Sequence, residues 1–257
     1  MPLQEKVPER DGEKTSAPVD LDEFQDRFIR RYRLKKKINA VLCFFIFLCG
    51  VTAVLYSVFV NHMNLFDRLR YLTFNITIFT SLISLVFVIV SIVEIVSDTE
   101  VTHKWVYYLR LSSAATELVT FIVVMVGLTP LVPDQPDITS YTGAMMHLVI
   151  PIATISSFVF NDAPVGRVRA WEPLYATWFI TVYALVMFFL FGTGILPGSR
   201  APYTFLDFEN ASPQFILTCF VAIYATGYGV SALLCYMNKK LSWLWFYDFR
   251  RQKHGRR

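Results

Sequence analysis

Six long apolar runs, separated by short connections, dominate the chain. The runs are Ile38–Val60, Leu69–Val96, Tyr108–Leu128, Tyr141–Phe160, Trp171–Phe191 and Ser212–Met237. Each reaches the roughly 20 residues that a helix needs to cross a hydrocarbon core. A soluble protein of 257 residues, 54% of them hydrophobic, could not bury all of these runs in one core. Because irregular backbone is not tolerated in lipid, the sequence predicts an all-α integral membrane bundle of six transmembrane helices.

The distribution of Lys and Arg predicts the orientation. With the N-terminus inside, the segments flanking the spans on the inner side collect 18 Lys and Arg, against Arg68, Arg70 and Arg200 outside. This asymmetry places both termini in the cytoplasm. We therefore expect a polar tail over residues 1–37, a transmembrane domain over 38–237 and a basic, aromatic tail over 238–257. The basic runs indicate binding to anionic lipid headgroups and not to nucleic acid.

Histidine and cysteine usage argues against a metal or a cofactor. All four cysteines lie inside the apolar runs and none forms a CxxC pair. His147 is the one histidine within a predicted span, so it cannot supply the paired axial ligands of a haem or the three or four ligands of a zinc site. We expect neither a cofactor nor a metal.

His147 is nevertheless a candidate functional residue, because an ionisable side chain at membrane depth is costly. A packing histidine that bonds across helices is the equally weighted alternative. Thr73 lies about 6 Å below the outer end of the second span and His147 about 9 Å below that of the fourth, at a rise of 1.5 Å per residue. A Thr hydroxyl beside an imidazole can form a nucleophile–base pair, although most membrane Thr residues only bond to their own backbone.

Several short motifs resemble the androgen-induced family of six-span membrane hydrolases, and most closely its bacterial six-span relatives. The motifs are RYLTFNITIF (Arg70–Phe79), HLVIP (His147–Pro151), Asp162, Glu172-Pro173-Leu174-Tyr175 and PYTFLDF (Pro202–Phe208). They cover roughly residues 40–237 and neither tail. The resemblance implies a Thr nucleophile at position 73 and a His partner at position 147.

The same resemblance implies a lipid substrate, specifically fatty acids esterified to a hydroxyl of another fatty acid. Thr73 would attack the ester carbonyl while His147 takes its proton. Asn75 and Tyr203 are candidates for stabilising the oxyanion, Pro151 belongs to the His motif, and Asp207 lies in the last outer loop. We therefore expect Asn75, Pro151, Tyr203 and Asp207 to form the substrate-binding region.

Two acidic residues within the spans leave other functions open. Glu117 lies near the middle of the third predicted span and could serve a small-solute or ion transporter. Glu94, near the inner end of the second span, is interpreted as a solvated interfacial acid. A third possibility is a non-catalytic lipid-binding membrane protein, in which neither Glu117 nor the Thr73–His147 pair matters.

Overall fold

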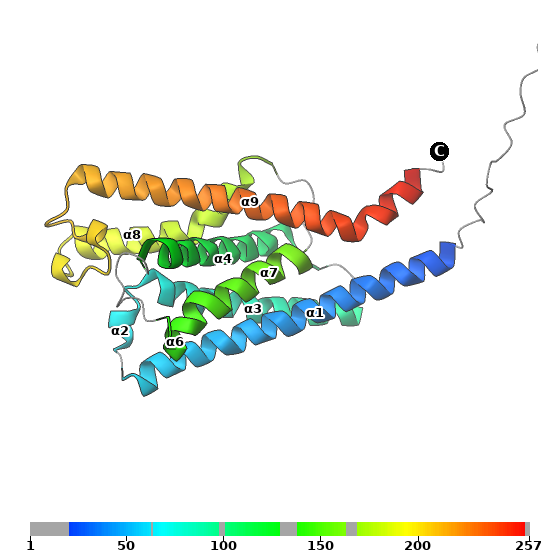
Figure 1. Cartoon of the computed structure of the whole chain (residues 1–257), viewed down its shortest axis with the longest axis horizontal. Coiled ribbons are helices and arrows are strands. Elements are labelled where there is room, and N and C mark those ends of the chain that lie inside the picture. The colour runs from blue at the N-terminus through cyan, green and yellow to red at the C-terminus, as the bar shows by residue number, and fades with distance from the viewer. Residues whose placement is uncertain (1–20, 63, 98–100, 129–137, 163–168, 255–257) are drawn as a thin grey trace, which may run out of the picture.

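The computed structural model is a bundle of long helices in which the first and last described residues, 21 and 254, lie at the same end (Figure 1). It describes residues 21–62, 64–97, 101–128, 138–162 and 169–254. We call the end that holds the termini the inner end, following the predicted topology, and the opposite end the outer end. The described residues exclude the first 20 residues of the predicted polar tail, residues 129–137 between the third and fourth predicted spans, and Arg167.

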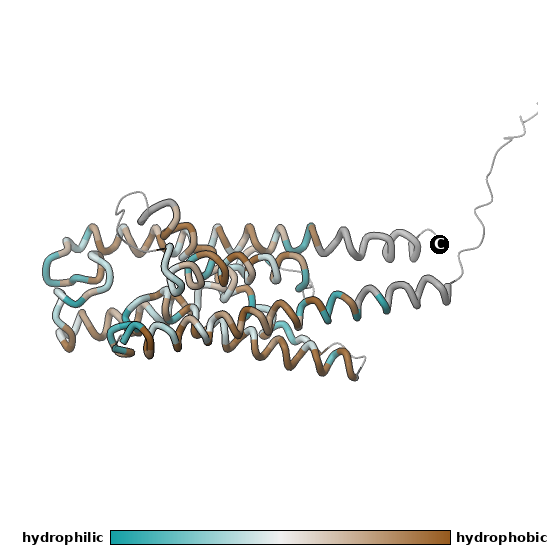
Figure 2. The backbone as a smooth tube through the Cα atoms, turned by 60° about the horizontal axis from the view of Figure 1, so that its bottom comes forward, coloured by the Kyte–Doolittle hydropathy of each residue, from teal (hydrophilic) through white to brown (hydrophobic). Residues whose placement is uncertain are grey.

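Among the described residues, six helical stretches are long and apolar enough to cross a membrane, so the predicted six-span membrane fold is confirmed. They are Arg33–Val60, Leu72–Ser97, Lys104–Met125, Tyr141–Asn161, Glu172–Gly192 and Pro213–Leu241. Apolar residues run along these stretches, whereas polar residues gather at the ends of the bundle (Figure 2).

The elements that build the spans are mostly α-helices, with π-helical turns at the outer ends of three spans and a 3₁₀ segment at the inner end of the fifth. The α-helices are α1 (Leu21–Leu55), α2 (Leu65–Arg68), α3 (Leu72–Ser97), α4 (Lys104–Ile122), α6 (Tyr141–Ala144), α7 (Ile150–Asn161), α8 (Trp178–Gly192) and α9 (Pro213–His254). Three π-helical segments are η1 (Tyr56–Val60), η2 (Val123–Leu128) and η3 (Met145–Val149). Three 3₁₀ segments are η4 (Glu172–Thr177), η5 (Gly198–Arg200) and η6 (Thr204–Leu206).

The predicted starts of the second and third spans need correction, and helix extends into both predicted tails. The second span does not start at Leu69, because α2 ends at Arg68 and α3 begins only at Leu72. The third helix begins at Lys104, before the predicted Tyr108. Both tails are partly helical, since α1 starts at Leu21 and α9 continues to His254.

The helix α4 lies at the centre of the bundle and is the most buried of the six spans. It packs against α3, α7, α8 and α9, while α1 covers α3 and α7. Backbones approach closely at Gly50 on α1, where an added Cβ would lie 1.8 Å from Ser81 Oγ on α3. This close approach is typical of small residues at membrane helix interfaces.

Candidate functional site

Polar side chains form a continuous stripe through the centre of the bundle. On α3, Thr73, Thr77, Thr80 and Ser84 recur at spacings of four, three and four, which places them on one helix face. We call the buried part of the stripe the polar seam, and each of its members is 0% exposed: Thr77, Thr80, Ser84, Arg110, Ser113, Thr116, Glu117, Thr154 and Ser157. Thr73 lies one turn outward from the seam.

Direct hydrogen bonds tie α3 to α4 along the seam. The Thr80 and Ser113 hydroxyls are 2.9 Å apart, and Arg110 Nη1 donates to Ser84 Oγ at 3.2 Å. These pairs set an antiparallel register, so α3 residues closer to the outer end face later residues of α4. Thr73, seven residues before Thr80, therefore lies at the level of Thr120, which is seven residues after Ser113.

Glu117 is the least satisfied member of the seam. Among the described residues, neither of its carboxylate oxygens has a hydrogen-bond partner. The Thr80 side chain faces it, but the geometry falls short of a hydrogen bond. The hydroxyls of Thr116 and Thr154 also lack partners within the described part of the chain. The outer half of the seam thus keeps free hydrogen-bonding capacity in the bundle core.

His147 lies on a π turn at the outer end of the fourth span. The Ile150 N–H bonds to the Met145 carbonyl, five residues back. Pro151, buried four residues after His147, has no N–H to donate to the His147 carbonyl. The π turn contacts α1, α3 and α4. The His147 side chain is buried, and its Nδ1 has no hydrogen-bond partner among the described residues.

The N-terminal turn of α3 is held by two of the predicted substrate-binding residues. Asn75 Nδ2 donates to the carbonyls of Leu69 and Tyr71, at 2.6 and 2.9 Å. The Leu72 N–H donates to the Tyr203 hydroxyl oxygen at 3.2 Å. An outer loop therefore reaches the residue next to Thr73, and both N–H donors of the Asn75 amide are used by the backbone.

Thr73 and His147 lie in neighbouring parts of the same outer layer. Their sequence neighbours, Phe74 and Met146, share one buried apolar cluster with Ala53 of α1. Within the described residues, no hydrogen bond joins the Thr73 hydroxyl to His147. The Thr73 carbonyl accepts a 2.8 Å bond from the Thr77 hydroxyl.

Asp207 and Tyr203 flank the 3₁₀ segment η6 in the last outer loop. Asp207 organises the outer loop, because its carboxylate accepts from Glu209 N, Asn210 N and Asn210 Nδ2. Burial raises the pKa of the Tyr203 hydroxyl to about 12, so it stays protonated at neutral pH. Tyr203 therefore keeps a proton to donate, which Asp207 cannot do once it is ionised.

Glu94 is not the solvated acid that we expect from its position. It is buried, its carboxylate pairs with Lys36 Nζ at 2.5 Å, and it accepts from Val101 N, Thr102 N and Thr102 Oγ1. Four donors leave little room for an ion or a transported proton. Glu94 instead ties Lys36 of α1 to the residues that precede α4.

A buried ion pair at the inner end was missed by sequence reasoning. Arg110 Nε donates to Asp162 Oδ2 at 3.2 Å, and Arg110 Nη2 donates to Ser157 Oγ at 2.8 Å. Asn39 Nδ2 donates to Asp162 Oδ1 at 2.9 Å, and Asn238 Nδ2 donates to the Asp162 carbonyl at 2.7 Å. Burial raises the pKa of Asp162, while Arg110 and Asn39 counteract that rise. This network joins α1, α3, α4, α7 and α9 and closes the seam towards the inner end.

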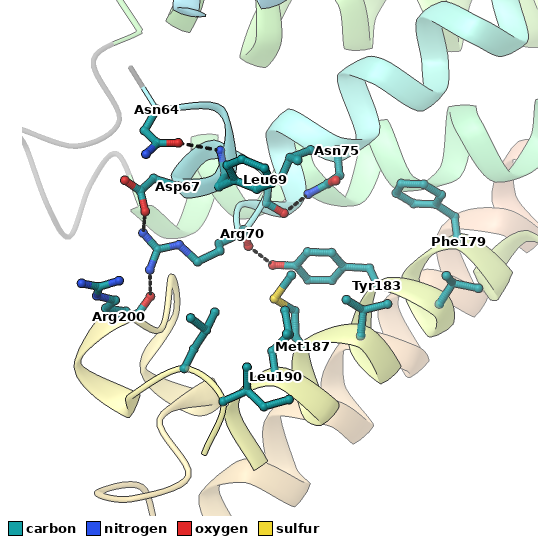
Figure 3. Close-up of a pocket in the computed structure, with 15 residues that line it drawn as sticks. Asn64, Asp67, Leu69, Arg70, Asn75, Phe179, Tyr183, Met187, Leu190 and Arg200 are labelled. Carbon is teal, nitrogen blue, oxygen red and sulfur yellow. Dashed lines mark hydrogen bonds and ion pairs between the residues drawn. The ribbon is translucent and has the colours of Figure 1, made fainter. Parts of the chain in front are cut away.

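A pocket of about 580 Å³ opens at the outer end between α2, the start of α3, α8 and the segment that follows α8 (Figure 3). Asn75, Phe179, Tyr183, Met187 and Leu190 are among its lining residues, and Arg70 and Arg200 lie at its polar end. Neither Thr73 nor His147 lines it. The pocket lies on the α8 side of α3, away from the polar face that carries Thr73.

The fold and the seam define an α-helical, multi-pass membrane protein with a buried polar centre. Comparison of the chain with protein family models, curated proteins and solved structures finds no match. The part of the chain that the structure describes contains no cluster of three His, Cys, Asp or Glu side chains suited to a metal ion.

Proposed function

We propose that the protein is a membrane-embedded lipid ester hydrolase with Thr73 as nucleophile and His147 as general base. The observation that carries the proposal is the position of Thr73 at the outer end of the α3 polar stripe, in the layer where the buried His147 leaves Nδ1 unpartnered. The motif resemblance supports the same pair. Catalytic hydrogen bonds are often long before substrate binds, so we expect Thr73 and His147 to approach when an ester occupies the layer.

In the proposed reaction, the imidazole of His147 accepts the Thr73 hydroxyl proton as Oγ1 attacks the ester carbonyl. The tetrahedral intermediate collapses to an acyl-threonine, and His147 returns the proton to the departing alcohol. A water molecule then attacks the acyl-threonine while His147 takes its proton, and His147 returns that proton to Thr73 Oγ1 as the fatty acid leaves. The products are a fatty acid and the hydroxylated lipid.

Tyr203 is the favoured oxyanion donor of the two candidates. Its hydroxyl oxygen accepts from the Leu72 N–H, next to Thr73, and its own proton remains available. Asn75, in contrast, donates its amide N–H groups to the Leu69 and Tyr71 carbonyls, so neither is available to an oxyanion. One such donor contributes about 3–4 kcal/mol to the transition state. We therefore expect Tyr203→Phe to lower turnover by about 100-fold or more.

The test combines variants at positions 73 and 147 with a long-chain lipid ester as substrate. Thr73→Ala and His147→Ala should each abolish hydrolysis, and their double variant should be barely worse, because the two residues act as a unit. Thr73→Ser keeps the hydroxyl and should retain part of the activity. A fluorophosphonate should label the wild type and leave Thr73→Ala unlabelled.

Thr218→Ala is the control, since Thr218 is an exposed threonine of α9 whose hydroxyl donates to the Gln214 carbonyl of its own helix at 2.7 Å. It should keep full activity and labelling. Hydrolysis that persists in Thr73→Ala, in protein that stays monodisperse in detergent, would refute the proposed nucleophile.

Glu117 favours a second candidate function, proton-coupled transport of a small solute. A buried carboxyl with both oxygens unpartnered can exchange a proton within the bundle. If this function applies, Glu117→Gln should abolish pH-driven uptake into proteoliposomes, and Thr73→Ala should leave that uptake intact. The opposite pattern, with hydrolysis lost in Thr73→Ala and retained in Glu117→Gln, supports the hydrolase.

A further inference from the structure

We infer that the pocket between α3 and α8 is a binding site for one outer-leaflet phospholipid. One acyl chain would lie in the apolar groove, and its phosphate would bind at Arg200 and Arg70. This inference rests on the pocket and not on hydrolysis, so it stands or falls separately from the proposed function.

The apolar part of the pocket suits an acyl chain that enters sideways from the bilayer. Its wall on α8 consists of Phe179, Val182, Val186, Met187 and Leu190. Val182 and Val186 are each 48% exposed on the surface that lipid covers, so the groove is open laterally. The volume of about 580 Å³ is within the roughly 300–1,000 Å³ range of small-ligand sites. A lipid with two chains can place one chain here and leave the other in the bilayer.

The polar end of the pocket provides the complementary charge. Arg70 is held in place: its Nη1 donates to the Arg200 carbonyl at 2.9 Å, and its Nη2 pairs with Asp67 (Figure 3). Tyr183 fixes the backbone beneath it by donating to the Arg70 carbonyl at 2.5 Å. The guanidinium of Arg200 has no partner among the described residues and lines the same pocket. Among the residues that line the pocket, Asp67 offsets the charge of Arg70, so Arg200 supplies the net positive charge for a phosphate.

The choice of a phospholipid follows from the position of the site. The exposed Phe66 and Ile195 side chains border the pocket at the outer end of the spans, where headgroups lie. Phospholipids are the most concentrated phosphate-bearing amphiphiles at that depth, and occupancy follows concentration.

The experiment is native mass spectrometry of the detergent-purified full chain, titrated with dioleoyl phosphatidylglycerol. We expect one tight lipid adduct. Arg200→Gln should weaken it by at least about tenfold, since a lost hydrogen bond to a charged group costs that much. Val186→Trp fills the groove without changing charge and should also remove the adduct.

The matched controls are Arg68→Gln and Val93→Trp. Arg68 carries the same charge on α2 without lining the pocket, and Val93 is a lipid-exposed valine of α3. Both should keep the adduct. Equal binding by the wild type, Arg200→Gln and Val186→Trp would overturn the inference. So would displacement of the phospholipid by equimolar palmitate, because the site would then prefer a carboxylate.

Discussion

At the scale of single residues, Glu117 and Asp162 are both buried acids, but their surroundings are opposite. Asp162 has an arginine and an asparagine on its carboxylate, whereas Glu117 has no hydrogen-bond partner in the described structure. Removing one member of a buried ion pair costs about 3–5 kcal/mol, because the other charge stays uncompensated.

We predict that Asp162→Asn lowers the stability of the protein by about that amount, and that Glu117→Gln leaves it unchanged or higher. The measurement is thermal unfolding in a mild detergent, with both variants compared with the wild type. Equal destabilisation by the two substitutions would mean that Glu117 is as firmly bonded as Asp162.

The sequence pointed to His147 and Glu117 because each is an ionisable residue inside an apolar run. It did not point to the partners of Arg110, because those partners come from other helices through the tertiary register. One available signal was overlooked. The four hydroxyl residues of α3 recur with helical spacing, and this pattern indicates one polar face that packs against other helices.

At the scale of elements, the π turn before α7 determines where His147 points. Pro151 prevents a regular α-helical bond to the His147 carbonyl, and π turns of this kind often occur at functional sites. We predict that Pro151→Ala lets the turn become regular, which would rotate His147 by roughly 100°, one residue step on the helix.

Hydrolysis should then fall by at least about tenfold, since misplaced catalytic groups lose rate steeply, while the protein stays folded. Pro213→Ala is the control, because Pro213 is the first residue of α9, where a proline N–H is not needed. Unchanged turnover in Pro151→Ala would show that the π turn does not position His147.

Span positions were predictable to within a few residues because hydropathy depends on the same apolar side chains that contact lipid. The break at Leu69–Tyr71 and the three π segments were not. Asn75 holds the break through its bonds to the Leu69 and Tyr71 carbonyls, and Pro151, which has no N–H, follows the π turn η3. Neither feature changes the hydropathy of a run.

At the scale of the whole molecule, the start of α1 and the end of α9 lie at the same end of the bundle (Figure 1). This agrees with the even number of spans found among the described residues. The cytoplasmic location of that end remains a prediction from the Lys and Arg asymmetry. Tags on either terminus should be protected from external protease in intact cells. Cysteines introduced at Ser199 or Asn210 should react with an impermeant maleimide, and labelling of the termini instead would reverse the topology.

The concentration of charge on α4 has a consequence for how the chain enters the membrane. Its span has the lowest mean hydropathy of the six, 1.4, and it carries both Arg110 and Glu117. Each such residue costs about 2.5–3.5 kcal/mol at the centre of an isolated inserting helix. The third segment leaving the ribosome is therefore poorly able to partition into lipid by itself. We therefore expect stable insertion of α4 to depend on α3 and on the later arrival of Asp162 and Ser157, which bond to Arg110.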